Sequence, residues 1–145
     1  METAQNNGPL IVEKVLNAPV EKVWGALTDI NQITQWYFKI ADFEPEIGFE
    51  FEFIGTDGTT EYLHKCVITA AIPNKKLAYT WRYEGNPGLS EVSFDLTADG
   101  DAAKVKITHT GLETFPQTSA FDRSNFNGGW NHILGVSLKD FVEKA

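Results

Sequence analysis

The stretch GGWNHILGVSLKDFVEKA (residues 128–145) ends the chain and predicts a long C-terminal helix. Apolar side chains recur along it, and just before it, three or four residues apart, which is the spacing that aligns them on one face of a helix. They are Phe126, Trp130, Ile133, Leu134, Leu138, Phe141 and Val142, with Ser137 among them. A stripe this wide needs a broad apolar surface, and a sheet that curves around the helix provides one.

Glycines interrupt this helix candidate, although glycine inside a helix costs about 1 kcal/mol relative to alanine. Gly135 and Gly128 fall near the edge of the apolar stripe. We expect the absent side chains to let the helix approach the sheet, or to leave space for a pocket beside it. Gly135→Leu should therefore disturb packing or ligand binding. Gly128 and Gly129 are expected to form the entry from the preceding loop into the helix.

The preceding part of the chain alternates apolar and polar residues with period two, which is typical of half-buried strands. The strand candidates are residues 10–16, 48–53, 59–72, 76–83, the segment around Val92, Phe94 and Leu96, and 103–109. Residues 10–16 are apolar on both faces, and Asp57-Gly58 predicts a hairpin. A loop of about fifteen residues, 111–125, leads into the final helix.

Two short helices are predicted between the first two strand candidates. Pro19 sets the backbone angle for the start of one helix, and Glu21 suits the helix dipole in its first turn. Asp29 and Gln32 have the spacing of a capping box at the start of the second. That helix carries Ile30, Ile33, Trp36 and Tyr37. One strand, two short helices, a run of antiparallel strands and a long helix indicate an α+β fold.

Length and charge restrict the class of protein. A chain of 145 residues fits one domain, which we place at residues 10–145 after a disordered tail, 1–9. Its net charge of −8 argues against nucleic acid and anionic membrane surfaces as partners. The single cysteine, Cys66, excludes a disulfide within the chain, and neither a secretory signal nor a membrane span is present in the sequence. We expect a cytoplasmic protein.

The residues that carry chemistry do not form a recognisable catalytic or metal-binding motif. His64, His109 and His132 lie on different elements without a paired carboxylate or cysteine at ligand spacing, so we expect no metal and no cofactor. Glu50 and Glu52 alternate with phenylalanines, which predicts a solvated strand face. His64 should point inward with Tyr62 and Cys66, either as a core histidine or as a polar group that orients a ligand.

Local motifs add a resemblance that covers residues 10–145. NAPVEKVWGALTD (17–29) is followed by Trp36, IPNKKLAYTWR (72–82) places Tyr-Thr-Trp on a strand, and ITHTG (107–111) leads to GGW and the last helix. In this order they resemble the START-like (SRPBCC, helix-grip) superfamily. Within it the chain resembles the family homologous to the C-terminal domain of the activator of the heat-shock protein 90 ATPase. The resemblance implies a curved antiparallel sheet around a long C-terminal helix, with two short helices after the first strand.

The superfamily resemblance also implies a cavity between the sheet and the long helix. The inward aromatic and apolar residues are the candidates for its lining: Trp36, Phe51, Phe53, His64, Trp81, Phe94, Phe126, Trp130 and Leu134. Polar groups in such a cavity could come from His64, Tyr83, Arg82 or Asn131. The alternative is that these aromatic residues fill a solid core.

Three functions remain open at this point. The first is a small protein that binds a hydrophobic or aromatic small molecule, or a lipid, in the cavity. The second is an enzyme of the cyclase or aromatase kind that uses a histidine or tyrosine in the pocket as acid or base, although no catalytic residues can be named. The third is a chaperone-associated module of the stress response, as the family resemblance implies. We expect a binding protein rather than an enzyme.

Overall fold

The computed structural model describes residues 9–37, 40, 42–56, 61–116 and 123–143. Its strands are β1 (Leu10–Leu16), β2 (Glu50–Thr56), β3 (Glu61–Ile72), β4 (Lys76–Tyr83), β5 (Ser90–Asp99) and β6 (Ala102–Thr110). Its helices are α2 (Val20–Thr28), α3 (Ile30–Trp36), the 3₁₀ turn η1 (Leu112–Thr114), α4 (Arg123–His132), the π-helical segment η3 (Ile133–Leu138) and α5 (Lys139–Glu143). No helix among these residues is long and apolar enough to cross a membrane.

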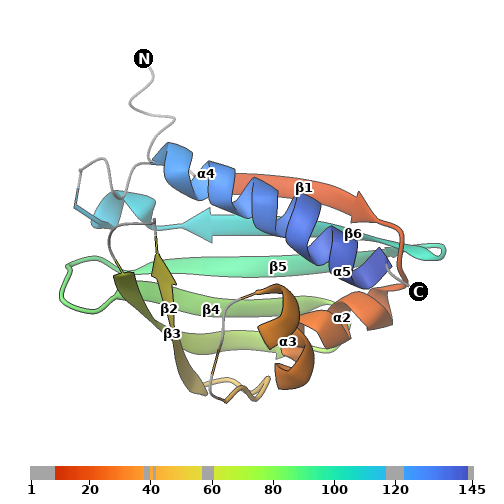
Figure 1. The fold of residues 1–145 in the computed structure, drawn as a ribbon, viewed down its shortest axis with the longest axis horizontal. Helices are drawn as coiled ribbons and strands as arrows, with labels where there is room; N and C mark the ends of the chain where they lie inside the picture. The colour runs from red at the N-terminus through yellow and green to blue at the C-terminus, as the bar shows by residue number, and fades with distance from the viewer. Residues whose placement is uncertain (1–8, 38–39, 41, 57–60, 117–122, 144–145) are drawn as a thin grey trace.

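The described strands form one antiparallel sheet in the order β1-β6-β5-β4-β3-β2. The first strand pairs with the last, so that Leu10 lies opposite His109 and Leu16 opposite Ala103. The helices cover one face of this sheet, and the C-terminal helix runs obliquely across it (Figure 1). This is the α+β helix-grip arrangement that the resemblance implies, and it confirms the predicted fold class.

The burial of the strands follows their alternation. On β4, Leu77, Tyr79, Trp81 and Tyr83 are all buried, as the sequence predicts. The apolar residues on both faces of 10–16 suggest a strand that is covered on both sides, which is wrong. Ile11 and Val15 are exposed, and only one face of β1 is covered. The predicted hairpin at Asp57-Gly58 lies outside the described residues. So does the predicted tail except for Pro9, whose carbonyl oxygen accepts a hydrogen bond from Arg123 at 2.8 Å.

Asp29 separates the two short helices and caps the second. Its side chain accepts a hydrogen bond from the backbone N–H of Asn31 at 2.9 Å, and from the side chain of Gln32 at 3.3 Å. The predicted reciprocal bond from Gln32 to the backbone N–H of Asp29 does not form, because that N–H donates to Gly25 in the preceding helix. The cap is therefore confirmed, although only half of the capping box forms.

The C-terminal helix begins at Arg123, within the segment predicted as a loop, and Leu112–Thr114 form a 3₁₀ turn there. Its buried residues recur at every fourth position: Phe126, Trp130, Leu134, Leu138 and Val142. In a regular α-helix, steps of four residues overshoot one turn, and the buried stripe would drift around the helix. The π-helical segment takes more residues per turn. It thereby rotates the stripe back toward the sheet, which keeps one face buried along the whole element.

Among the described residues, the glycines of this helix have no close neighbour on the sheet beyond the end of one side chain. A Cβ added to Gly135 would meet only the end of the Lys14 side chain on β1, at 3.5 Å, which is ordinary van der Waals contact. A Cβ at Gly128 or Gly129 would have no described atom within 4 Å outside its own helix. The expectation that these glycines control the clearance between helix and sheet is wrong, because they lie on the edge and outer side of the helix.

We therefore expect Gly135→Ala to raise the free energy of unfolding by about 0.5–1 kcal/mol, since alanine loses less backbone entropy in a helix. Gly135→Leu should cost less than about 1 kcal/mol, because the Lys14 side chain can move aside. Urea denaturation of both variants measures this. A loss of several kcal/mol for the leucine variant would show that the helix does lie close to the sheet at Gly135.

Candidate functional site

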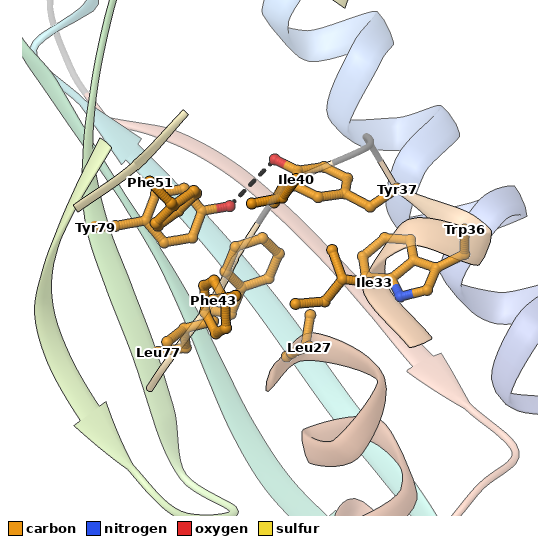
Figure 2. Close-up of a pocket in the computed structure, with 10 residues that line it drawn as sticks. Leu27, Ile33, Trp36, Tyr37, Ile40, Phe43, Phe51, Leu77 and Tyr79 are labelled. Atoms are coloured by element: carbon orange, nitrogen blue, oxygen red, sulfur yellow. Dashed lines mark hydrogen bonds between the residues drawn. The ribbon is translucent and has the colours of Figure 1, made fainter. Parts of the chain in front are cut away.

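A small pocket lies between the two short helices and the sheet (Figure 2). Its volume is about 10 Å³, which is roughly the space of one water molecule. It is lined by Leu27, Ile33, Trp36, Tyr37, Ile40, Phe43, Phe51, Leu77, Tyr79 and Phe94. No residue of the described C-terminal helix lines this pocket, so it does not lie in the space between the sheet and that helix where the sequence predicts a cavity.

Three parts of the chain build this pocket. Leu27 comes from α2, and α3 and the residue that ends it contribute Ile33, Trp36 and Tyr37. Phe51, Leu77, Tyr79 and Phe94 rise from β2, β4 and β5 and form the floor. Ile40 and Phe43 close the pocket from a segment that is neither helix nor strand. Helices and strands thus hold most of the lining, whereas two apolar side chains are held by an irregular connection.

Aromatic rings meet edge to face inside the pocket. The ring centroids of Phe43 and Phe51 are 5.1 Å apart, and those of Phe51 and Tyr79 are 5.0 Å apart, with interplanar angles of 67° and 76°. This is the geometry that aromatic pairs prefer over face-to-face stacking. The pocket walls therefore offer both the faces and the edges of aromatic rings to a ligand.

The polar atoms of the pocket are few. The indole N–H of Trp36 donates to the carbonyl oxygen of Ala26 at 2.8 Å. The hydroxyl oxygens of Tyr37 and Tyr79 lie 3.1 Å apart and share a hydrogen bond, and Figure 2 shows them pointing toward each other across the pocket. Burial raises the pKa of both tyrosines well above the usual value, so both are neutral phenols at pH 7.

The structure divides the predicted lining residues into two groups. Trp36, Phe51 and Phe94 line the pocket. The others pack elsewhere in the core: Phe53, His64, Trp81, Phe126, Trp130 and Leu134. The sequence did not single out the rest of the pocket lining, including Tyr37, Tyr79 and Phe43. Periodicity placed Tyr37 and Tyr79 on inner faces of their elements, but nothing in the pattern indicated that their hydroxyls would meet.

His64 is buried in an aromatic cluster rather than in the pocket. Its ring stacks on Phe53 at 4.5 Å between centroids and meets Trp81 and Tyr83 edge to face at 4.9 and 4.7 Å. Its Nδ1 donates to the carbonyl oxygen of Tyr62 at 2.9 Å. Burial lowers its pKa to about 4, so the ring is neutral at pH 7.

His109 is the centre of a buried hydrogen-bond chain that the sequence did not indicate. The indole N–H of Trp130 donates to His109 Nδ1 at 3.0 Å, so the proton must be on Nε2, which donates to Ser90 Oγ at 2.7 Å. Ser90 Oγ in turn donates to the carbonyl oxygen of Trp81 at 3.0 Å. Burial lowers the pKa of His109 to about 3. The chain joins the C-terminal helix to the sheet. The sequence did contain one indication that His109 is buried, because it continues the alternation of the inward residues Val105 and Ile107.

The remaining candidates lie outside the pocket. Tyr83 is buried and accepts a hydrogen bond from the indole N–H of Trp81 at 2.9 Å, whereas Arg82 is exposed and Asn131 donates to Asn127 on its own helix. Burial raises the pKa of the Cys66 thiol, which disfavours the reactive thiolate. Among the described residues, no three His, Cys, Asp or Glu side chains could together hold a metal ion.

Comparison with known proteins places this fold in a family. Residues 17–143, most of the chain, match a family model described as Activator of Hsp90 ATPase homolog 1-like protein. No curated protein matches the sequence.

Several solved structures are similar over nearly the whole chain. Protein MLL2253 from Mesorhizobium loti is 27% identical, with a TM-score of 0.75, over 93% of this chain and 96% of that chain. The Aha1 dimer from Colwellia psychrerythraea is 25% identical, with a TM-score of 0.70, over 93% and 96%. CalU16 from Micromonospora echinospora is 26% identical, with a TM-score of 0.72, over 93% of this chain and 74% of that chain. These likenesses agree with the helix-grip fold.

Proposed function

This chain belongs to the family described as Activator of Hsp90 ATPase homolog 1-like protein, and on that premise we propose that it binds a hydrophobic or aromatic small molecule in the pocket beneath α2 and α3. The observation that carries the proposal is the lining of the pocket, which is apolar except for the indole N–H of Trp36 and the hydroxyls of Tyr37 and Tyr79. Ligand sites are typically apolar with a small number of placed polar groups. The cytoplasm is the compartment we assign to this function.

A ligand has to displace a side chain, because the pocket holds only about 10 Å³. Phe43 is the aromatic lining side chain that can move without breaking a helix or a strand pairing. Its backbone forms neither helix nor strand, and its N–H is bonded to the side chain of the adjacent Asp42 at 2.8 Å. Phe51, Leu77 and Tyr79, in contrast, are held by the hydrogen bonds of paired strands. Binding therefore proceeds by rotation of Phe43 away from the floor of the pocket.

Tryptophan fluorescence and native mass spectrometry test the proposal. Trp36 lines the pocket, so a bound aromatic compound should change its emission, and native spectra should show a complex of one ligand per chain. The panel should contain single-ring aromatics, polyphenols and lipids. If no member changes the emission or forms a complex at millimolar concentration, the proposal is wrong.

We expect Phe43→Ala to lower the free energy of unfolding by about 3 kcal/mol, since it empties a buried aromatic site. The space left behind is apolar and should take up benzene or a related single ring. Thermal denaturation with and without benzene measures both effects. Phe141→Ala is the matched control, because it removes the same ring from a half-buried position on α5 that does not line the pocket. Equal stabilisation of both variants by benzene would contradict the assignment of the site.

The cyclase or aromatase alternative needs two titratable groups that face each other in the pocket. Tyr37 and Tyr79 meet this requirement in geometry. Their raised pKa values keep both protonated at pH 7, so neither can act as a general base. The pair suits binding better than proton abstraction.

A chaperone-associated role is the second candidate, because the matching family model carries the name of an ATPase activator. Affinity purification of the chain from its own cells, followed by an ATPase assay with the recovered chaperone, tests this role. Co-purification with stimulated ATP hydrolysis would support this role, and the absence of both effects would exclude it. A nucleic-acid or anionic membrane partner is not proposed, given the net charge of −8.

A further inference from the structure

The polar end of the pocket consists of two hydroxyl groups on different parts of the fold. Tyr37 ends α3, and Tyr79 lies in the middle of β4, with 3.1 Å between their hydroxyl oxygens. On the proposed function, this pair is the part of the site that meets any polar atom of the ligand. We propose that the Tyr37–Tyr79 pair selects uncharged aromatic ligands that carry an acceptor oxygen, such as a carbonyl, and rejects carboxylates of the same shape.

Hydrogen-bond counting supports this selection. Each phenol has one O–H donor and can also accept. When Tyr37 donates to Tyr79, the O–H of Tyr79 can turn toward the pocket and donate to a ligand oxygen without breaking the bond between the two tyrosines. A carbonyl oxygen is the complementary group, because it accepts and does not compete for the existing donor.

The electrostatics of the pocket exclude an anion. None of the residues that line it carries a charge. A carboxylate that enters an apolar site loses its hydration, which is costly unless a cation or several donors replace the water. One phenol O–H is too little compensation. The uncharged carbonyl compound has a much smaller desolvation cost, and its single acceptor is satisfied.

The shape of the walls favours a flat ring. Phe43 and Tyr79 both present their rings to Phe51 edge to face, at centroid distances of 5.1 and 5.0 Å. When Phe43 rotates away, a planar ligand can take its place against Phe51 with the same edge-to-face contact. The Tyr79 ring also contacts Phe51, so a ligand ring in this place would lie near Tyr79.

Three single-ring probes separate the possibilities: acetophenone, ethylbenzene and benzoate. Affinities are measured at pH 7 by tryptophan emission and confirmed by native mass spectrometry, on the natural chain and on Tyr79→Phe. We expect the substitution to weaken acetophenone binding about tenfold, the effect of one hydrogen bond of roughly 1.4 kcal/mol, and to leave ethylbenzene binding unchanged. Benzoate should not bind at concentrations that saturate the site with acetophenone.

Tyr83→Phe is the matched control, because it removes a buried tyrosine hydroxyl that does not line the pocket. It should change no affinity. If Tyr79→Phe does not fold, the affinities of acetophenone and benzoate for the natural chain test the selection directly. Equal binding of benzoate and acetophenone, or equal effects of Tyr79→Phe on acetophenone and ethylbenzene, would overturn the selection while the pocket remains a binding site. If none of the probes binds, the proposed binding function fails for this ligand class, and the selection fails with it.

Discussion

Replacing Trp130 with alanine is expected to lower the free energy of unfolding by at least about 4 kcal/mol. Trp130 is only 2% exposed, and removal of a buried tryptophan typically costs about 3–5 kcal/mol. The substitution also leaves His109 Nδ1 without the donor that the indole provides at 3.0 Å, and a buried acceptor without a partner adds about 1–3 kcal/mol. Domains of this kind are stable by only about 5–15 kcal/mol. The variant should therefore be close to unfolded at 37 °C.

Urea denaturation at 25 °C measures this loss, and two further variants separate its causes. Trp130→Phe keeps most of the ring and removes the N–H, so we expect about half of the loss. Trp24→Ala removes an indole from α2 at a half-buried position and should cost less than Trp130→Ala. If Trp24→Ala and Trp130→Ala cost the same, the hydrogen-bond chain through His109 contributes nothing beyond ordinary burial.

The second large effect is a loss of stability in mild acid. His109 and His64 are neutral in the folded protein, with pKa values lowered by burial to about 3 and about 4. In the unfolded chain they take up protons near pH 6.5. Stability is therefore fully present above pH 6.5 and is lost as the pH falls toward the folded pKa values. Between pH 6.5 and pH 5 each histidine should cost roughly 2 kcal/mol, at 1.36 kcal/mol for each pH unit.

Denaturation midpoints at pH 7 and pH 5 measure this loss. His64→Phe should remove about half of it, because phenylalanine does not titrate and fits among the surrounding rings. The control is His132→Gln, since His132 is exposed at the end of α4 and its replacement should leave the pH dependence in place. A natural chain that is equally stable at pH 7 and pH 5 would show that the buried histidines are already protonated or accessible in the folded state.

Much of this fold was accessible from the sequence, because it depends on local periodicity. Alternation in β4 predicted that Leu77, Tyr79, Trp81 and Tyr83 share a buried face, and the structure confirms it. The cap at Asp29 depends on neighbours two and three residues away and was also predicted in part. Such features are decided within one element, where the spacing of residues along the chain determines which way each side chain points.

The candidate site was only partly predictable. Trp36, Phe51 and Phe94 were predicted to line a cavity between the sheet and the long helix, and they line the pocket beneath α2 and α3. Phe43 was missed because it belongs to an irregular segment, where no period indicates direction. His64 was expected inside the cavity and is buried, yet it packs in a separate cluster with Phe53 and Trp81. Knowing that a side chain points inward does not reveal which other inward side chains it meets.

The sequence by itself determined the order of the strands, the buried faces of strands such as β4, and the family to which the chain belongs. Only the tertiary structure decided that the pocket beneath α2 and α3 is small, that the hydroxyls of Tyr37 and Tyr79 meet, and that Gly135 in the last helix lies beside the end of the Lys14 side chain. The reason is physical: burial faces follow from spacing within one element, whereas contacts between elements depend on strand register, on the π-helical rotation at Ile133–Leu138 and on the exact volume of each side chain. The contacts that result depend on residues from several elements at once.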